Sequence, residues 1–182
     1  MAEYGAHPSQ RAIVDNQLQT AASRYPGREL NQVAEASCGI GQITDVLTPQ
    51  ARRVTAIDFT PTMLAEAQAR WDDLASVDFQ LSSLQDFPPW AEDSCDVTMT
   101  VRVLMHIFDE ADLTQPCRAI GRASRLVITG EYTSAATQVG AWSRLRSPQQ
   151  DADLFGGQKP ARETLDYAGD LSTFMLLQAG TR

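Results

Sequence analysis

Two acidic residues and a glycine-containing turn are suited by type and spacing to bind a nucleoside. Residues 33–41 read VAEASCGIG, so Glu35 is followed at close spacing by Gly39 and Gly41. Glycine lets the backbone approach a ligand closely and adopt conformations that other residues avoid. Asp58 ends the next β-branched segment, and a carboxylate there can accept hydrogen bonds from both hydroxyls of a ribose. The pattern predicts a cradle for a ribose-containing ligand.

Alternating apolar and helical segments must position these residues. The patterns predict strands at residues 32–37, 54–58, 77–81, 96–103, 126–131 and 173–177. Helices are expected at residues 8–22, in a short segment that ends at residue 47, in a segment that begins at residue 61, and over residues 109–122. Pro116 is expected to split or restart the last of these helices. Strands that alternate with helices predict an α/β fold, a single doubly wound, mostly parallel sheet with helices on both faces. Because residues 133–160 are polar and rich in turn formers, we expect a reduced C-terminal strand region.

The predicted sheet directs attention to the turn after its first strand. In an open parallel sheet, ligands bind beyond the carboxyl ends of the strands, near the point where the strand order reverses. A G-x-G pair alone is weak evidence for a ligand-binding turn. More specific evidence is the order of the features along this segment: strand, acid, G-x-G, helix, strand and terminal acid. A dinucleotide fingerprint needs a third small residue where Thr44 stands, which disfavours an NAD-binding fragment. An Asp58 that only ends a strand is the remaining alternative.

Residues 33–47 resemble the first motif of class I S-adenosylmethionine-dependent methyltransferases, written acid-x-G-x-G-x-G. Glu35, Gly39 and Gly41 match, and Ser37 occupies the place of the first glycine. Residues 54–67 are similar to the second motif of that family. The segments after residue 96 and after residue 126 are similar to its fourth and fifth strands, so the likeness covers about 30–131.

This resemblance implies S-adenosyl-L-methionine as the cofactor. Asp58 would hold the ribose hydroxyls, while Phe59 and Met63 would flank the adenine. Ser83 and Leu84 stand where the family often has an acid that meets the adenine amino group. The residues predicted to bind the cofactor are Glu35, Ser37, Gly39, Gly41, Asp58, Phe59, Met63, Ser83, Leu84 and Val101.

Two residues near the end of the fourth predicted strand are candidates for acceptor chemistry. A neutral imidazole suits general-base work, so His106 is the candidate catalytic residue. A histidine that packs against or caps the following helix is the alternative. Arg102 is the candidate substrate-binding residue, with a carboxylate or phosphate as its partner. An exposed charge at a strand end would explain it equally well.

Composition narrows the classes of partner. The net charge is −8, whereas nucleic-acid binding draws on a surplus of Lys and Arg, so no nucleic acid is expected. No apolar run reaches the length that spans a bilayer, and the first residues do not resemble a signal peptide. These features predict a cytoplasmic protein without a membrane partner. The 3 cysteines are widely spaced and there are 2 histidines, so we expect no metal site.

The expected organisation is a single domain over residues 1–182, with 1–28 as an N-terminal helical lid. Residues 133–165 would form a loop-rich segment on the acceptor side, with Trp142, Arg144 and Phe155 in its wall. The predicted function is O- or N-methylation of a small-molecule acceptor. A protein or peptide methyltransferase and a catalytically inactive S-adenosylmethionine-binding scaffold subunit are the alternatives. The sequence predicts neither the acceptor nor the oligomeric state.

Overall fold

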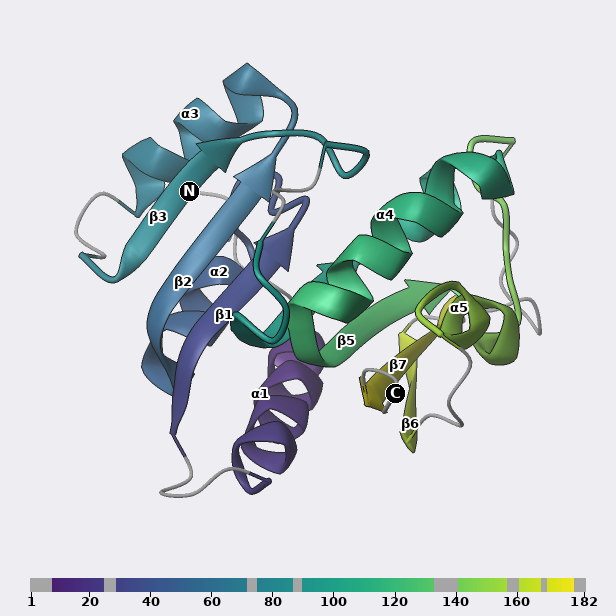
Figure 1. Cartoon of the computed structure of the whole chain (residues 1–182), viewed down its shortest axis with the longest axis horizontal. Coiled ribbons are helices and arrows are strands. Elements are labelled where there is room, and N and C mark those ends of the chain that lie inside the picture. Colours follow the sequence, from purple (N-terminus) through teal and green to yellow (C-terminus); the bar gives the residue numbers. More distant parts are fainter. Residues whose placement is uncertain are drawn as a thin grey trace.

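A seven-stranded sheet organises the chain in a computed structural model (Figure 1). The structure describes residues 8–24, 29–71, 75–86, 90–132, 141–156, 161–167 and 170–178. The strands are β1 (Leu30–Ala36), β2 (Ala51–Asp58), β3 (Val77–Leu81), β4 (Cys95–Val101), β5 (Ser124–Tyr132), β6 (Ala161–Tyr167) and β7 (Asp170–Gln178). The helices are α1 (Pro8–Ala22), α2 (Thr44–Leu47), α3 (Pro61–Arg70), α4 (Glu110–Ala123) and α5 (Pro148–Leu154), with short 3₁₀ turns η2 (Thr48–Gln50) and η3 (Leu104–His106).

The strand order is β3-β2-β1-β4-β5-β7-β6. β1 pairs in parallel with both β2 and β4, and β2–β3 and β4–β5 are parallel too. β7 runs antiparallel to its neighbours β5 and β6. The order therefore reverses between β1 and β4, where parallel α/β sheets bind their ligands. The predicted doubly wound, mostly parallel sheet is confirmed.

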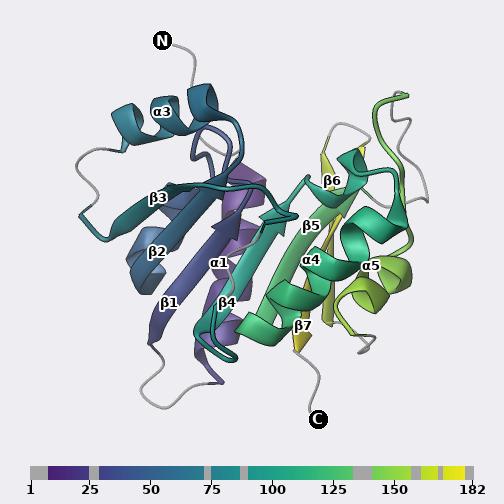
Figure 2. The ribbon, with the colours of Figure 1, turned by 45° about the horizontal axis from the view of Figure 1, so that its top comes forward.

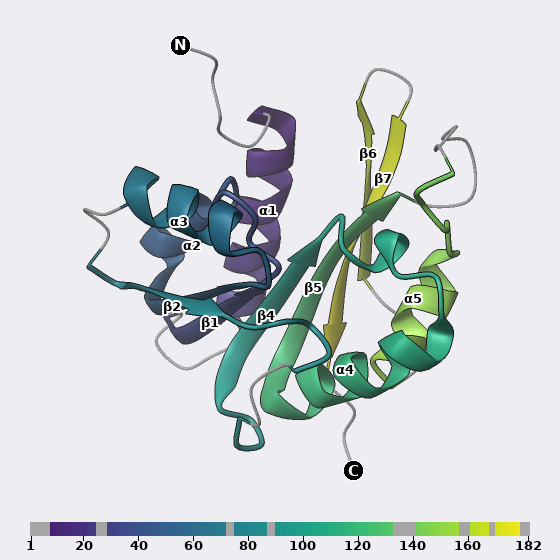
Figure 3. The same ribbon diagram turned by 90° about the horizontal axis from the view of Figure 1, so that it is seen from above.

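Helices cover both faces of the sheet. Figure 2 shows α4 and α5 in front of the central strands and α1 behind them, and Figure 3 shows α1, α2 and α3 together on one side. The side chains of β5 alternate between the two layers, as a strand requires. Leu126 and Ile128 pack in the core cluster that contains Leu18 of α1, whereas Val127 packs with Ile120 of α4.

Helix α1 has the predicted bounds and is part of the core. Its residues Ile13, Val14 and Leu18 are buried against the strands, and Arg11 forms an ion pair with Asp45 at 2.5 Å. The described part of the expected lid is thus a structural helix on one face of the sheet. Residues 1–7 and 25–28 of that segment lie outside the described residues.

Two expectations about regular structure were wrong. Helix α4 runs through Pro116 without a break. Although proline removes one backbone hydrogen bond, Pro116 itself is buried on the apolar face that holds this helix to the sheet. The C-terminal strand region is not reduced either, because β6 and β7 form a hairpin of 7 and 9 residues. The β6 sequence ARETLDY is polar, which suits an edge strand and hides it from a search for apolar runs.

The helices of the described ranges include none with the length and apolar character that crossing a bilayer requires.

Candidate functional site

A cleft of about 430 Å³ opens at the carboxyl ends of β1, β2 and β4. Its volume lies in the range of small-molecule binding sites, and it lies where the strand order reverses. The residues that line it are Ser37, Gly39, Asp58, Phe59, Ser83, Leu84, Gln85, Val101, Arg102, Val103, His106 and Ile107.

The loop after β1 has a left-handed backbone at three positions. Ser37, Gly39 and Gly41 have φ angles of 65°, 55° and 76°. Ser37 thus adopts a glycine-like conformation in the position where the resembling motif has glycine. A Cβ on Gly39 would meet no atom within 4 Å, whereas one on Gly41 would lie 2.6 Å from Nε1 of Trp71. Gly39 therefore leaves open space beside the cleft, and Gly41 makes room for Trp71.

Asp58 connects this loop to the start of α3. Its Oδ2 accepts a hydrogen bond from the Gly39 amide at 2.8 Å, and its Oδ1 accepts one from the Thr60 amide at 2.8 Å. Each carboxylate oxygen has two lone pairs, so both retain an acceptor site. The carboxylate is 5% exposed and lines the cleft. Its position suits recognition of a ribose.

Glu35 lies beneath the loop and does not line the cleft. Its Oε2 accepts a hydrogen bond from Oγ1 of Thr44 at 2.5 Å. Burial raises the pKa of Glu35 to about 8, although the bond from Thr44 opposes the shift, and the nearby Asp45 and Asp58 raise it further. At neutral pH the side chain is therefore protonated.

Arg102 follows β4 in a strained conformation. Its φ is 57°, and its amide donates to the Gly130 carbonyl at 2.8 Å. The guanidinium lies 4.9 Å from the ring centroid of Tyr132, and no carboxylate of a described residue pairs with it. Guanidinium stacked on an aromatic ring keeps its in-plane donors available, so Arg102 can meet an anion at the cleft.

The turn η3 after Arg102 is held from the protein interior. The Glu131 carboxylate, which is 1% exposed, accepts hydrogen bonds from the amides of Val103, Leu104 and Met105 at 3.0, 3.1 and 3.3 Å. Arg146 donates to the carbonyls of Leu104 and Ile107 at 2.8 Å each. Burial raises the pKa of Glu131 to about 7, against the opposing effect of these amides.

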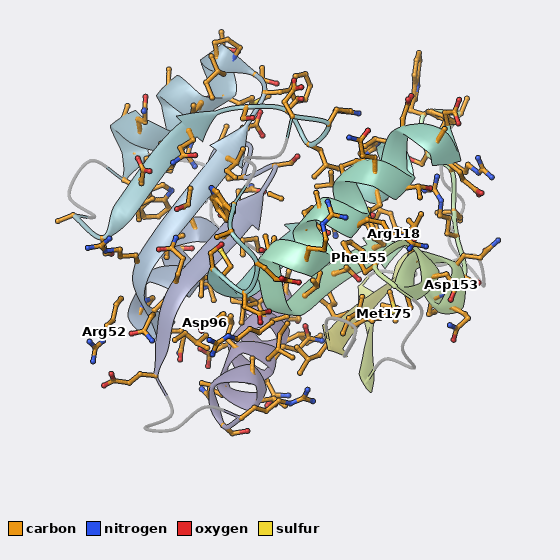
Figure 4. The ribbon with its side chains drawn as sticks, viewed as in Figure 1. Arg52, Asp96, Arg118, Asp153, Phe155 and Met175 are labelled. Atoms are coloured by element: carbon orange, nitrogen blue, oxygen red, sulfur yellow. The ribbon has the colours of Figure 1, made fainter. Side chains whose placement is uncertain are left out.

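His106 extends from this turn to the cleft. Its Nδ1 lies 3.0 Å from the carbonyl oxygen of Trp142. The Trp142 side chain is 80% exposed, and Arg144 is tied to Glu110 and to the Phe108 carbonyl. Phe155 packs with Met175 in the core between the sheet and the helices α4 and α5 (Figure 4). None of the three residues expected in the acceptor wall is among those that line the cleft.

The structure brings together most of the residues that the sequence predicted for the site. Nine of them line the cleft, namely Ser37, Gly39, Asp58, Phe59, Ser83, Leu84, Val101, Arg102 and His106. Glu35, Gly41 and Met63 do not. Glu35 lies beneath the loop, Gly41 makes room for Trp71, and Met63 is 45% exposed on α3. Gln85, Val103 and Ile107 were missed, as were the supporting residues Glu131 and Arg146. Glu131 is an acid near the end of a buried strand, and this position could have indicated a role at the site. Arg146 stands in a polar segment whose sequence gives no such indication.

The chain belongs to the methyltransferase domain family, whose model matches residues 33–125, just over half of the chain. A protein of Mycobacterium tuberculosis named a probable S-adenosylmethionine-dependent methyltransferase is 30% identical over 110 residues, which cover 60% of this chain and 38% of the relative. The ubiquinone biosynthesis O-methyltransferase of Methylocella silvestris is 28% identical over 107 residues, which cover 57% of this chain and 41% of the relative. The matched part thus spans about two fifths of these relatives.

A solved structure shares the fold over nearly the whole chain. The N-methyltransferase NodS from Bradyrhizobium japonicum, in complex with S-adenosylhomocysteine, superposes with a TM-score of 0.76 at 14% sequence identity. The match covers 96% of this chain and 89% of that one. The likeness shows that the two chains share the same fold.

Replacing Ser37 should reveal the strain of its backbone. We expect S37G to be more stable than S37A, with a free energy of unfolding about 1 kcal/mol higher, because only glycine adopts a left-handed φ without cost. Both variants lack the hydroxyl, so S37A is the matched control. Urea denaturation of the two proteins measures the difference. Equal stability of the two variants would show that this backbone is not strained.

Replacing Glu35 with glutamine should change the pH dependence of stability. In the folded chain Glu35 holds its proton up to about pH 8, compared with an ordinary pKa of 4.5. Between these values unfolding releases a proton, so the free energy of unfolding falls as the pH rises, by at most about 1.4 kcal/mol per pH unit. The E35Q variant cannot ionise there. Its stability relative to the native chain should therefore increase from pH 5 to pH 8.

Urea denaturation at several pH values checks this prediction. E29Q is the control, since Glu29 is exposed in a surface ion pair with Arg52. A stability difference between E35Q and the native chain that is constant over the range would contradict the buried, protonated state of Glu35.

Proposed function

We propose that this chain binds S-adenosyl-L-methionine in the cleft and transfers its methyl group to a small-molecule acceptor, by O- or N-methylation. The observation that carries the proposal is the juxtaposition of Gly39 and Asp58 at the reversal of the strand order. Membership of the methyltransferase domain family supports the same reaction. The cofactor supplies a methyl group already activated by its bond to a positively charged sulfur.

The residues of the cleft fit this cofactor. Gly39 leaves the space that any Cβ would fill, and Asp58 keeps acceptor sites for two ribose hydroxyls beside it. Phe59 is 67% exposed at the rim and Leu84 is buried at the wall, so these apolar groups can enclose an adenine. Ser83 and backbone amides would replace the acid that the family often places there.

The chain's own contribution to the reaction is mainly positional. Correct orientation of reacting groups can contribute roughly 7 to 11 kcal/mol to a barrier reduction, and one cleft contains both the residues proposed for the cofactor and those proposed for the acceptor. Arg102 would bind a carboxylate or phosphate of the acceptor. His106 would accept the proton that the acceptor atom loses.

A small molecule is the proposed acceptor for two reasons. The net charge of −8 disfavours nucleic acid. The name of one relative, the ubiquinone biosynthesis O-methyltransferase, refers to the synthesis of a small molecule. Label from S-[methyl-¹⁴C]adenosylmethionine that enters only macromolecules of a lysate would favour a protein acceptor. Tight cofactor binding without turnover on any acceptor would favour an inactive scaffold.

Removing the Asp58 carboxylate should weaken nucleoside binding. We expect D58A to lower the affinity for both S-adenosylmethionine and S-adenosylhomocysteine by at least ~100-fold, because hydrogen bonds from two ribose hydroxyls to a charged acceptor contribute about 1.5–3 kcal/mol each. Calorimetric titration measures both affinities, with NAD as the negative control ligand. D78N, a charge change at an exposed position of β3, is the matched control. Unchanged affinity in D58A would refute the assignment of the cleft.

Arg102 should affect the acceptor and not the cofactor. For an acceptor that carries a carboxylate or phosphate, we expect R102Q to raise KM at least ~10-fold, because a charge-assisted hydrogen bond is lost. The affinity for S-adenosylhomocysteine should stay within twofold of the native value. R118Q makes the same change on the exposed face of α4 and is the control. Steady-state kinetics decide, and an unchanged KM in R102Q would exclude the anion-binding role.

A further inference from the structure

Buried charges hold the turn that carries His106 from two sides. Glu131 accepts hydrogen bonds from the backbone amides at the start of η3, and Arg146 donates hydrogen bonds to the carbonyls of Leu104 and Ile107. Both side chains are almost completely buried, at 1% and 3% exposure. A buried charge is costly unless it is paired or hydrogen-bonded, so displacement of this turn would remove the three backbone donors of Glu131 and the two carbonyl acceptors of Arg146. The turn therefore has a strongly determined position.

The segment that supplies Arg146 also contacts the turn at other points. The Arg144 amide donates to the Met105 carbonyl at 2.7 Å, and its guanidinium donates to the Phe108 carbonyl at 2.5 Å. The carbonyl of Trp142 faces Nδ1 of His106 at 3.0 Å. Residues 142–146, which we name the support segment, thus run alongside η3 and follow its backbone.

The contact with Trp142 determines the tautomer of His106. A carbonyl oxygen can only accept a hydrogen bond, so Nδ1 must carry the proton in the 3.0 Å contact. In a neutral imidazole the other nitrogen, Nε2, then has a free lone pair. Among the described residues Nε2 has no hydrogen-bond partner, and His106 lines the cleft. A histidine that merely capped the following helix would be engaged there instead, whereas Asp109 caps α4.

We propose that Glu131 and Arg146 are positioning residues that hold His106 as the Nδ1–H tautomer, with Nε2 presented to the acceptor as the base. This inference rests on the proposed methyl transfer and assigns the support segment a role in it. The proton of the acceptor O–H or N–H moves to Nε2 while the acceptor atom forms its bond to the methyl carbon. The electron pair of the broken sulfur–methyl bond stays on sulfur, and the imidazolium later returns its proton to water.

The tautomer can be measured directly. Long-range ¹H–¹⁵N correlation spectra of the ¹⁵N-histidine-labelled full chain at pH 8 distinguish Nδ1–H from Nε2–H. The chain has 2 histidines, so the H7Q variant assigns the signals of His106. We expect a protonated Nδ1 in the native chain, with or without S-adenosylhomocysteine. The Nε2–H form, which free histidine favours, would overturn the inference.

Two conservative variants test the positioning role. Lysine has one ammonium nitrogen, so it cannot reproduce the bonds that two separate guanidinium nitrogens of Arg146 make to the two carbonyls. The glutamine of E131Q has an NH₂ group in place of one carboxylate oxygen, and this donor cannot accept from a backbone N–H. We expect R146K and E131Q to shift His106 toward the Nε2–H form and to lower kcat roughly 10- to 100-fold, because a misplaced base loses part of the 10²- to 10⁴-fold that a general base contributes. The affinity for S-adenosylhomocysteine should stay within twofold. R144Q alters an exposed part of the support segment, so it is expected to fold even if the buried variants do not, and to shift the tautomer partly.

R11Q, which breaks an ion pair on the other face of the sheet, is the matched control and should change neither the spectrum nor kcat. A fall in kcat without a change in the His106 signals would reject the positioning role. An unaltered tautomer in all three variants, R144Q included, would reject it too. Failure of the proposed function looks different: the native chain would show the Nδ1–H form but neither cofactor binding nor turnover.

Discussion

The carboxylate of Asp58 accepts hydrogen bonds from two loops that belong to different strand–helix units. The Gly39 amide comes from the loop after β1, and the Thr60 amide comes from the start of α3. Because a buried carboxylate needs such donors, the end of β2 fixes the shape of the loop beside it. The floor of the cleft is therefore formed before any ligand arrives, and the groups that would meet a nucleoside need little rearrangement.

Backbone strain is concentrated at the same place. Three non-glycine residues of the described ranges have a positive φ, and two of them, Ser37 and Arg102, directly follow β1 and β4. These are the strands between which the order reverses. Left-handed conformations cost of order 1–3 kcal/mol for such residues and persist where the surroundings determine them. Here the backbone turns away from the sheet directly after β1 and after β4, and the cleft lies between these two turns.

Local patterns in the sequence were sufficient to predict that Gly39 and Asp58 lie beside one cleft. Gly39 follows β1 and Asp58 ends β2, and the parallel pairing of these short apolar strands brings the two residues together. Glu35 was assigned to the cleft because its spacing fits the motif, but spacing alone does not tell a lining residue from one buried beneath the loop. Helix α4 shows a similar limit, since the preference of Pro116 is overridden by burial of the helix face.

The position of η3, which carries His106 at the cleft, depends on contacts that sequence patterns do not reveal. Arg146 reaches Leu104 across 42 residues, and Glu131 reaches the same turn across 27. No periodicity or motif connects such positions. The hairpin of β6 and β7 was underestimated for a related reason: a polar edge strand is defined by its pairing with a neighbour and not by its own composition.

The position of the support segment has a consequence for how such a domain can diversify. The support segment lies outside the part of the chain that the family model matches, which ends at residue 125. Its residues are not among those that line the cleft, so substitutions and length changes there act on the cleft only through the backbone contacts that hold η3. The loops around Asp58 can stay unchanged meanwhile, provided that each new segment still supplies a buried cation for the carbonyls of Leu104 and Ile107.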